Sequence, residues 1–261
     1  MTDPTAPSAP SPPHSQFTPG AGRALVLVHP IGASLRFWDA LLPHLQGRMP
    51  VLRYDLRGHG DSAVTPGDCT IDQLADDLLA LADAQGLADF DLCGVSLGGM
   101  VALAVAARAG DRVHRVVVSS TAPRVAPPPN GWDGRRDAAL KSGMAPLAGP
   151  MVERMFSAAF RERGDPLIGT LRAVFETMSP AGYAGAVAVL RDADLTDRLA
   201  RVAAPTMVVA GQDDPLCPPE KQHALAEALP SAQAVLLDCG HFPPVERPAE
   251  FARLLLSHLT D

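Results

Sequence analysis

Short apolar runs rich in β-branched residues alternate along this chain with segments of helical periodicity. Six of the runs have the length of a strand: residues 24–28, 51–55, 90–93, 113–118, 206–210 and 234–237. Between most of them, apolar side chains recur every three or four residues, as they do on one face of an amphipathic helix. This alternation predicts an α/β domain with a mostly parallel sheet flanked by helices.

The alternation breaks between residues 123 and 199. A turn-rich PPPNG segment at 127–131 is followed by several short helical patterns without an intervening strand. One of these patterns, with Val152, Met155, Phe156 and Phe160 on one face, predicts a single helix. A helical insertion between two strands of a sheet is typical of a lid, so we expect residues 123–199 to cover the active face.

The N-terminal segment has a different composition from the rest of the chain. Residues 1–22 are rich in Pro, Ser, Thr and Ala and carry too few apolar side chains to offset the entropy of ordering. We therefore expect a disordered tail at 1–22 and one domain over 23–261. The start lacks the basic and apolar regions of a signal peptide, and no apolar run approaches the roughly 18 residues of a membrane span. These features predict a cytoplasmic protein.

Charge and cysteine content exclude several classes of partner. The net charge is −7, and no long Lys/Arg block is present, which argues against nucleic acid and anionic membranes as partners. The four cysteines show no zinc-ligand spacing, so we expect reduced, buried thiols and no metal or organic cofactor. A small-molecule substrate is the expected partner, and the sequence leaves the oligomeric state open.

The segment GVSLG at 94–98 follows one predicted strand directly and precedes an Ala/Val/Leu-rich helix. A serine on such a sharp turn is pushed above the sheet edge, and flanking glycines avoid steric overlap there. The helix that follows aims its N-terminus at negative charge developing nearby. Ser96 is therefore the predicted nucleophile. The alternative, a glycine-rich turn with an incidental serine, loses weight because a base and an acid follow in suitable places.

A serine hydroxyl needs a neighbouring base. His241 lies in the loop LDCGHFPP directly after the last predicted strand, at the edge of the sheet where Ser96 emerges. Most other histidines fall in the tail, on helices or at the start of a strand. His29 and His59 occupy loops near the site, but both precede Ser96 in the chain. We therefore predict His241 as the general base.

The acid of such a site should follow a strand between the nucleophile and the base. GQDDP at 211–215 does so and offers two adjacent carboxylates, Asp213 and Asp214. We favour Asp214 as the partner of His241, with Asp213 as a turn-forming residue. The chain order Ser, Asp, His is the one used by α/β-hydrolases, which predicts that fold for this chain.

Two backbone N–H groups are candidates for stabilising an oxyanion. The N–H of Leu97 follows the nucleophile directly. The loop HPIG at 29–32 follows the first predicted strand, and because Pro30 has no N–H, Ile31 is the favoured second donor. The alternative reading of HPIG is a simple tight turn.

Several of these segments are similar to those of 3-oxoadipate enol-lactonases. The elbow CGVSLGGM at 93–100, YDLRGHGDS at 54–62 and GQDDP are shared widely among α/β-hydrolases, whereas SSTAPR at 119–124 and GWDGR at 131–135 resemble lid segments of the lactonases more specifically. The resemblance covers roughly residues 24–259. Two features depart from the lactonase pattern, namely the HPIG loop and the Pro-rich tail in place of an N-terminal hairpin.

The resemblance implies a hydrolase that converts 3-oxoadipate enol-lactone to 3-oxoadipate, a β-ketoadipate pathway step in aromatic compound catabolism. Such a lactone carries a free carboxylate, so a cationic side chain near the pocket is expected. Arg135 is the first candidate, with Trp132 on the same helix face, and Arg124 is the second. Each could instead be an ordinary lid residue. Alternative functions are a carboxylesterase, a meta-cleavage C–C hydrolase, a cofactor-free perhydrolase or haloperoxidase, and a non-enzymatic ligand receptor.

Overall fold

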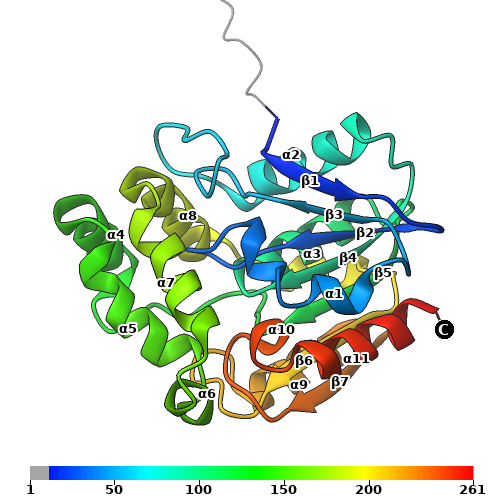
Figure 1. Ribbon diagram of the computed structural model, residues 1–261. Coiled ribbons are helices and arrows are strands. Elements are labelled where there is room, and N and C mark those ends of the chain that lie inside the picture. Colours follow the sequence, from blue (N-terminus) through cyan, green and yellow to red (C-terminus); the bar gives the residue numbers. More distant parts are fainter. Residues whose placement is uncertain (1–11, 261) are drawn as a thin grey trace, which may run out of the picture.

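The computed structural model describes residues 12–260, and its strands form one twisted sheet in the order β1-β3-β2-β4-β5-β6-β7 (Figure 1). Every neighbouring pair is parallel except β1 with β3. The strands are β1 (Ser15–Thr18), β2 (Ala24–Val28), β3 (Val51–Tyr54), β4 (Phe90–Val95), β5 (Val113–Ser119), β6 (Thr206–Gly211) and β7 (Ala232–Leu237).

The parallel strands match the sequence prediction closely. The six predicted strands correspond to β2 to β7, and most differ from the predicted range by one or two residues at an end. All side chains of β2, β4 and β6 are buried, as expected for strands covered on both faces. The fold is therefore the predicted α/β-hydrolase fold, with a mostly parallel sheet flanked by helices.

Helices cover both faces of the sheet. The crossovers β3–α2–β4, β4–α3–β5 and β6–α9–β7 all advance in one direction across the sheet, and their right-handedness places these helices on one face. Helices α1 and α11 pack together on the opposite face (Figure 1). The flanking helices are η1 (Leu35–Trp38), α1 (Leu42–Leu45), α2 (Ile71–Ala84), α3 (Leu97–Arg108), α9 (Pro219–Ala228), α10 (Pro243–Glu246) and α11 (Pro248–Thr260).

The start of α2 shows how local sequence sets these boundaries. The Thr70 hydroxyl accepts the N–H of Gln73 at 3.2 Å, and the Gln73 side chain accepts the N–H of Thr70 at 2.9 Å. This capping box satisfies two N–H donors that a helix start leaves unpaired.

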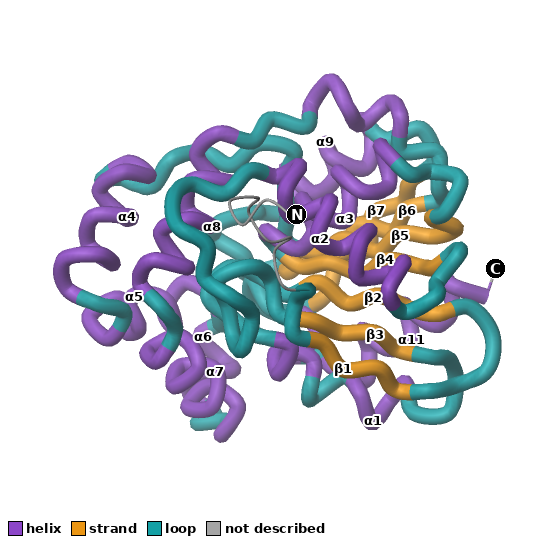
Figure 2. The backbone as a smooth tube through the Cα atoms, turned by 90° about the horizontal axis from the view of Figure 1, so that it is seen from above, coloured by secondary structure: helices purple, strands orange, loops and turns teal. Residues whose placement is uncertain are grey.

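The insertion between β5 and β6 is helical, as predicted, and gathers beyond one end of the strands (Figures 1 and 2). The single helix predicted around Val152 and Phe160 is wrong, because the chain leaves helical geometry at Phe156 and Ser157 caps a new helix. The insertion contains α4 (Gly131–Ser142), α5 (Ala145–Met155), α6 (Ala158–Glu162), α7 (Pro166–Thr177), α8 (Pro180–Asp192) and η2 (Thr196–Arg201).

The prediction of a disordered tail over 1–22 is wrong for its second half. Residues 1–11 lie outside the described residues, but Ser15–Thr18 form β1 and pair antiparallel with Val51–Tyr54. His14 continues this attachment, since its Nδ1 lies 2.8 Å from Asp55 Oδ2. The pairing occurs because β3 would otherwise be the exposed edge, and backbone hydrogen bonds need no apolar side chains. Within residues 12–260, no helix is long and apolar enough to span a bilayer.

Candidate active site

Ser96 lies on the sharp turn between β4 and α3, in a strained backbone conformation. Its φ of 55° lies in the left-handed region, which a residue with a Cβ rarely adopts. The neighbouring glycines are required for close approach: a Cβ on Gly94 would overlap the backbone of Gly98, and a Cβ on Gly98 would overlap that of Val28. The turn that the GVSLG motif predicts is therefore present, with Ser96 at its apex.

A network of hydrogen bonds that the sequence analysis did not predict supports the turn at Ser96. The Thr121 hydroxyl donates to the carbonyl oxygen of Ser96 at 2.7 Å. Gln222, on α9 and fully buried, holds Thr121 in turn by accepting its N–H at 3.3 Å and donating to its carbonyl oxygen at 2.5 Å. Because Gln222 lies 101 residues from Thr121 in the chain, no local pattern could have revealed it.

His241 and Asp214 form a buried pair at the same edge of the sheet. His241 Nδ1 lies 2.8 Å from Asp214 Oδ2, and both side chains are almost inaccessible to solvent. Burial alone would raise the pKa of Asp214, but the charge and hydrogen bond of His241, with N–H donors from the following turn, outweigh it and lower the pKa. The adjacent Asp213 is exposed, so Asp214 is the carboxylate that contacts His241.

These residues come from strands that end at one edge. Ser96 follows β4, Asp214 follows β6 and His241 follows β7, and parallel strands place their carboxyl ends together. The topology thus brings to one edge three residues that lie far apart in the chain.

The other two histidines near this edge support the loops instead. His29 Nε2 accepts the N–H of Leu56 at 2.9 Å, and His59 Nε2 accepts the N–H of Gly32 at 3.1 Å. Burial lowers the pKa of His29 to about 4 and that of His59 to about 3. Both rings are therefore neutral near pH 7, with Nε2 engaged as an acceptor and unable to take a proton from Ser96.

The loop after β2 contains a backbone N–H that no acceptor among the described residues uses. The N–H groups of Gly32 and Ala33 are used by His59 Nε2 and the carbonyl oxygen of Pro30, whereas within residues 12–260 the N–H of Ile31 donates no hydrogen bond. Leu97 is the first residue of α3, and the first N–H groups of a helix have no intrahelical acceptor. Both N–H groups thus remain available at this edge.

The loop that carries His241 is bonded to the insertion. Glu246, on α10 and buried, accepts the N–H of Gly240 at 3.0 Å, the N–H of Ser157 at 3.0 Å and the Ser157 hydroxyl at 2.6 Å. The N–H of His241 itself donates to the carbonyl oxygen of Met155 at 3.0 Å. The start of α6 and the His241 loop therefore form one hydrogen-bonded unit.

Two adjoining cavities lie at the insertion: the larger is lined by insertion residues, and the smaller is also lined by residues of the loop after β2. The larger one, which we call the lid cavity, has a volume of about 290 Å³. Arg135, Met151 and Phe175 line both the lid cavity and the much smaller second cavity. The second cavity is also lined by Ile31, while Ser96 and His241 line neither. Arg135 is thus the cationic group that connects the lid cavity with the loop carrying Ile31.

The other lid residues singled out in the sequence lie elsewhere. Trp132 is buried and lines neither of these cavities, but its ring lies 5.9 Å from the Arg135 guanidinium carbon. This contact agrees with the expectation that the two share a helix face. Arg124 is largely exposed and pairs with Asp194 at 3.8 Å, outside both cavities.

Among residues 12–260, two groups of side chains bring metal-ligating atoms within 4.8 Å of one another: Asp214 with Cys217 and His241, and His14 with Asp55 and Asp61. Burial raises the pKa of the Cys217 thiol, which disfavours the thiolate that a metal needs. Asp55 already accepts the N–H groups of Leu35 and Asp61. Both groups thus have internal hydrogen bonds that a metal would have to break. As expected, all four cysteines are free and buried.

Comparison with known proteins identifies the family to which this chain belongs. The model of the alpha/beta hydrolase fold family matches residues 23–248. The chain belongs to the α/β-hydrolase family. This α/β hydrolase is 29% identical to 3-oxoadipate enol-lactonase 2 of Acinetobacter baylyi, over 87% of this chain and 85% of the relative.

Solved structures give the same picture. The enol-lactonase from Burkholderia xenovorans LB400 superposes with a TM-score of 0.92 at 33% identity, covering 95% of this chain and 96% of the other. A thermophilic esterase from Thermogutta terrifontis, solved with malate bound, gives a TM-score of 0.88 at 31% identity, covering 94% and 93%. The α/β hydrolase therefore resembles both lactonases and esterases, and the lactonase resemblance seen in the sequence is confirmed.

Proposed function

We propose that this α/β hydrolase is a carboxylic ester hydrolase that opens a carboxylated enol-lactone, 3-oxoadipate enol-lactone, to 3-oxoadipate. Ser96 is the nucleophile, His241 the general base and Asp214 the acid that orients the base. The N–H groups of Ile31 and Leu97 stabilise the oxyanion. No metal or organic cofactor takes part in these steps.

The reaction proceeds through an acyl-enzyme. The Ser96 hydroxyl attacks the lactone carbonyl while His241 Nε2 takes its proton, because Asp214 engages Nδ1 and leaves Nε2 free. The tetrahedral intermediate collapses with cleavage of the ring C–O bond, and His241 returns the proton to the enol oxygen. The enol tautomerises to a ketone, which makes ring opening hard to reverse. His241 then activates water, which hydrolyses the ester to Ser96.

The observation that carries the choice of substrate is the place of Arg135. Arg135 lines both the lid cavity and the small cavity beside Ile31. A substrate whose scissile carbonyl is held at the Ile31 N–H could therefore place its free carboxylate on the Arg135 guanidinium. Its Nε donates to the Tyr183 hydroxyl at 2.6 Å, which fixes the guanidinium. Trp132 supports the same group through a cation–π contact. The similarity to two enol-lactonases supports the same substrate.

The test is a direct assay of purified protein with the enol-lactone and with short neutral p-nitrophenyl esters. We expect a higher kcat/KM for the lactone, and Ser96→Ala should abolish turnover of both, with a loss of about 10⁴-fold or more. Ser142→Ala, at an exposed position on α4, is the matched control and should behave as the wild type. Unchanged turnover in Ser96→Ala would contradict the nucleophile assignment.

A carboxylesterase is the second candidate function. The structural similarity to the Thermogutta terrifontis esterase favours it, and the malate bound to that esterase is itself a dicarboxylate. The same assay separates the two, because an esterase would prefer the p-nitrophenyl esters and leave the lactone largely unconverted.

A further inference from the structure

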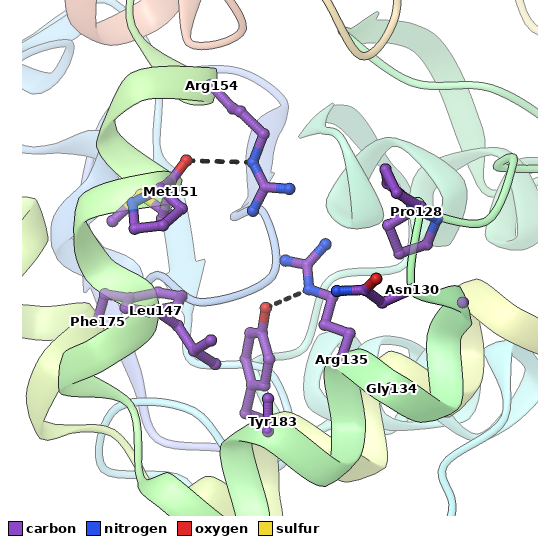
Figure 3. A pocket seen from close by; sticks show the side chains of 13 residues that line it. Pro128, Asn130, Gly134, Arg135, Leu147, Met151, Arg154, Phe175 and Tyr183 are labelled. Atoms are coloured by element: carbon purple, nitrogen blue, oxygen red, sulfur yellow. Dashed lines mark hydrogen bonds between the residues drawn. The ribbon is translucent and has the colours of Figure 1, made fainter.

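The lid cavity contains two arginines and no carboxylate. Arg135 on α4 and Arg154 on α5 line it together with uncharged residues, and no Asp or Glu is among the described residues lining either cavity. In Figure 3 both guanidinium groups reach toward the middle of this space from opposite helices. In a chain of net charge −7, such a cationic cavity indicates that an anion binds there.

Both guanidinium groups are anchored in a way that leaves their outer nitrogens unused. Arg135 donates through Nε to the Tyr183 hydroxyl at 2.6 Å, and Arg154 donates through Nε to the carbonyl oxygen of Pro150 at 3.1 Å (Figure 3). Within residues 12–260, the Nη groups of both side chains have no hydrogen-bond acceptor, and neither guanidinium lies within ion-pair distance of a carboxylate. These are the atoms with which arginine binds carboxylates in pairs.

Two other arginines of the insertion are paired with a carboxylate. Arg136, next to Arg135 in the chain, pairs with Asp68 at 2.7 Å, and Arg191 pairs with Asp68 at 2.8 Å. The half-buried Arg154 is in the opposite situation: burial, and then repulsion from Arg135, lower its pKa. Two like charges held together in a partly dry space repel each other, and a bound anion would relieve this repulsion.

We propose that Arg154 is a specificity-determining residue that forms, with Arg135, a two-arginine clamp for a carboxylate remote from the scissile carbonyl. The clamp selects esters and lactones of dicarboxylic acids whose second carboxylate is free. This inference rests on the proposed hydrolase function but not on the enol-lactone as its substrate. Because the two arginines come from different helices, the bound carboxylate also joins α4 to α5.

The experiment compares two substrates that differ only in charge: mono-p-nitrophenyl adipate and the same ester with its free carboxylate methylated. In Arg154→Gln, the ratio of kcat/KM for the charged ester to that for the neutral ester should fall roughly 10- to 100-fold, mainly through KM. Arg154→Lys should retain part of the preference, because it keeps the charge but loses the paired donors. Arg161→Gln, an exposed lid residue with the same change of charge, should leave the ratio unchanged.

A second readout is competitive inhibition of neutral-ester hydrolysis by free adipate. We expect the inhibition constant to rise by a similar factor in Arg154→Gln and to stay constant in Arg161→Gln. An unchanged charged-to-neutral ratio, or an equal loss on both esters, would overturn the clamp. If the wild type fails to open the enol-lactone yet shows the Arg154-dependent preference, the proposed lactone is wrong and the clamp stands.

Discussion

At the carboxyl edge of the sheet, the backbone itself places the reactive groups, whereas in the lid two long side chains reach the cavity from separate helices. Ser96 is held by a strained turn at φ 55°, and the His241–Asp214 pair is almost fully buried. Arg135 and Arg154 are half-buried, and each is anchored by one hydrogen bond of its own side chain.

This difference separates the reaction from the choice of substrate. Backbone geometry at the sheet edge is set by strand pairing and by glycines that tolerate no Cβ, so it changes little from one substitution to the next. Side chains on short lid helices can be exchanged without disturbing the sheet. We therefore expect sheet-edge substitutions to lower kcat for every ester, and lid substitutions to change KM for charged esters.

After Ser96→Ala, the largest effect should come from Asp214→Asn. The amide can no longer stabilise the imidazolium of His241 or fix its reactive tautomer, so kcat for a neutral aryl ester should fall about 10⁴-fold. Steady-state kinetics on the purified variant measures this. Asp213→Asn, the exposed neighbour, serves as the control and should retain wild-type kcat. A large loss in the Asp213 variant with little in the Asp214 variant would reverse the assignment.

The next effect concerns stability in acid. The unfolded chain protonates His29 near pH 6.5, whereas burial lowers the pKa in the folded chain to about 4. The contribution of neutral His29 to the free energy of unfolding is therefore complete above about pH 6.5. It declines as the pH falls toward 4, by on the order of 3 kcal/mol. In His29→Gln, which keeps an acceptor for the N–H of Leu56, the free energy of unfolding should lose less between pH 7 and 4.5.

Urea unfolding at the two pH values measures this difference. His44→Gln, at an exposed position, is the control and should follow the wild type. An acid loss in His29→Gln equal to that of the wild type would show that His29 is not among the groups that make the sheet edge sensitive to acid.

The smallest effect should come from Trp132→Leu in the lid. Loss of the cation–π contact would loosen Arg135 and raise KM for a carboxylated ester about threefold. KM for the methylated ester should stay close to the wild-type value, as should both constants in Leu140→Ala, an exposed position on the same helix. A fall in kcat for both esters would mean that the lid and the sheet edge are not separable.

The sequence predicted the parallel part of the sheet because each strand from β2 to β7 carries its own local pattern. It did not predict β1, since Ser15–Thr18 has little apolar character and is ordered by pairing with Val51–Tyr54. The same limit applies to the site. Motif context pointed to Ser96 and His241, but only coordinates separate Asp214 from the adjacent Asp213.

Contacts between distant segments were beyond local reasoning altogether. Gln222 reaches Thr121 from another helix, and the position of Arg154 relative to Arg135 depends on how α5 packs against α4. Trp132 was placed on the correct helix face, yet the sequence could not tell whether its ring would face the cavity or the arginine beside it.

The hydrogen bonds of Glu246 have a consequence for chimeras in which the insertion is exchanged between related hydrolases. A recombinant that received residues 123–199 from another α/β hydrolase would keep Glu246 and the His241 loop of the host. Unless the inserted segment carried a hydroxyl at the position of Ser157, Glu246 would lose one of its three hydrogen bonds, since the other two come from backbone N–H groups. The segment that must be exchanged as one unit is thus larger than the insertion, because it includes the turn from Gly240 to Glu246. A chimera designed without this turn would gain a new lid but weaken the hydrogen bonds that position the His241 loop.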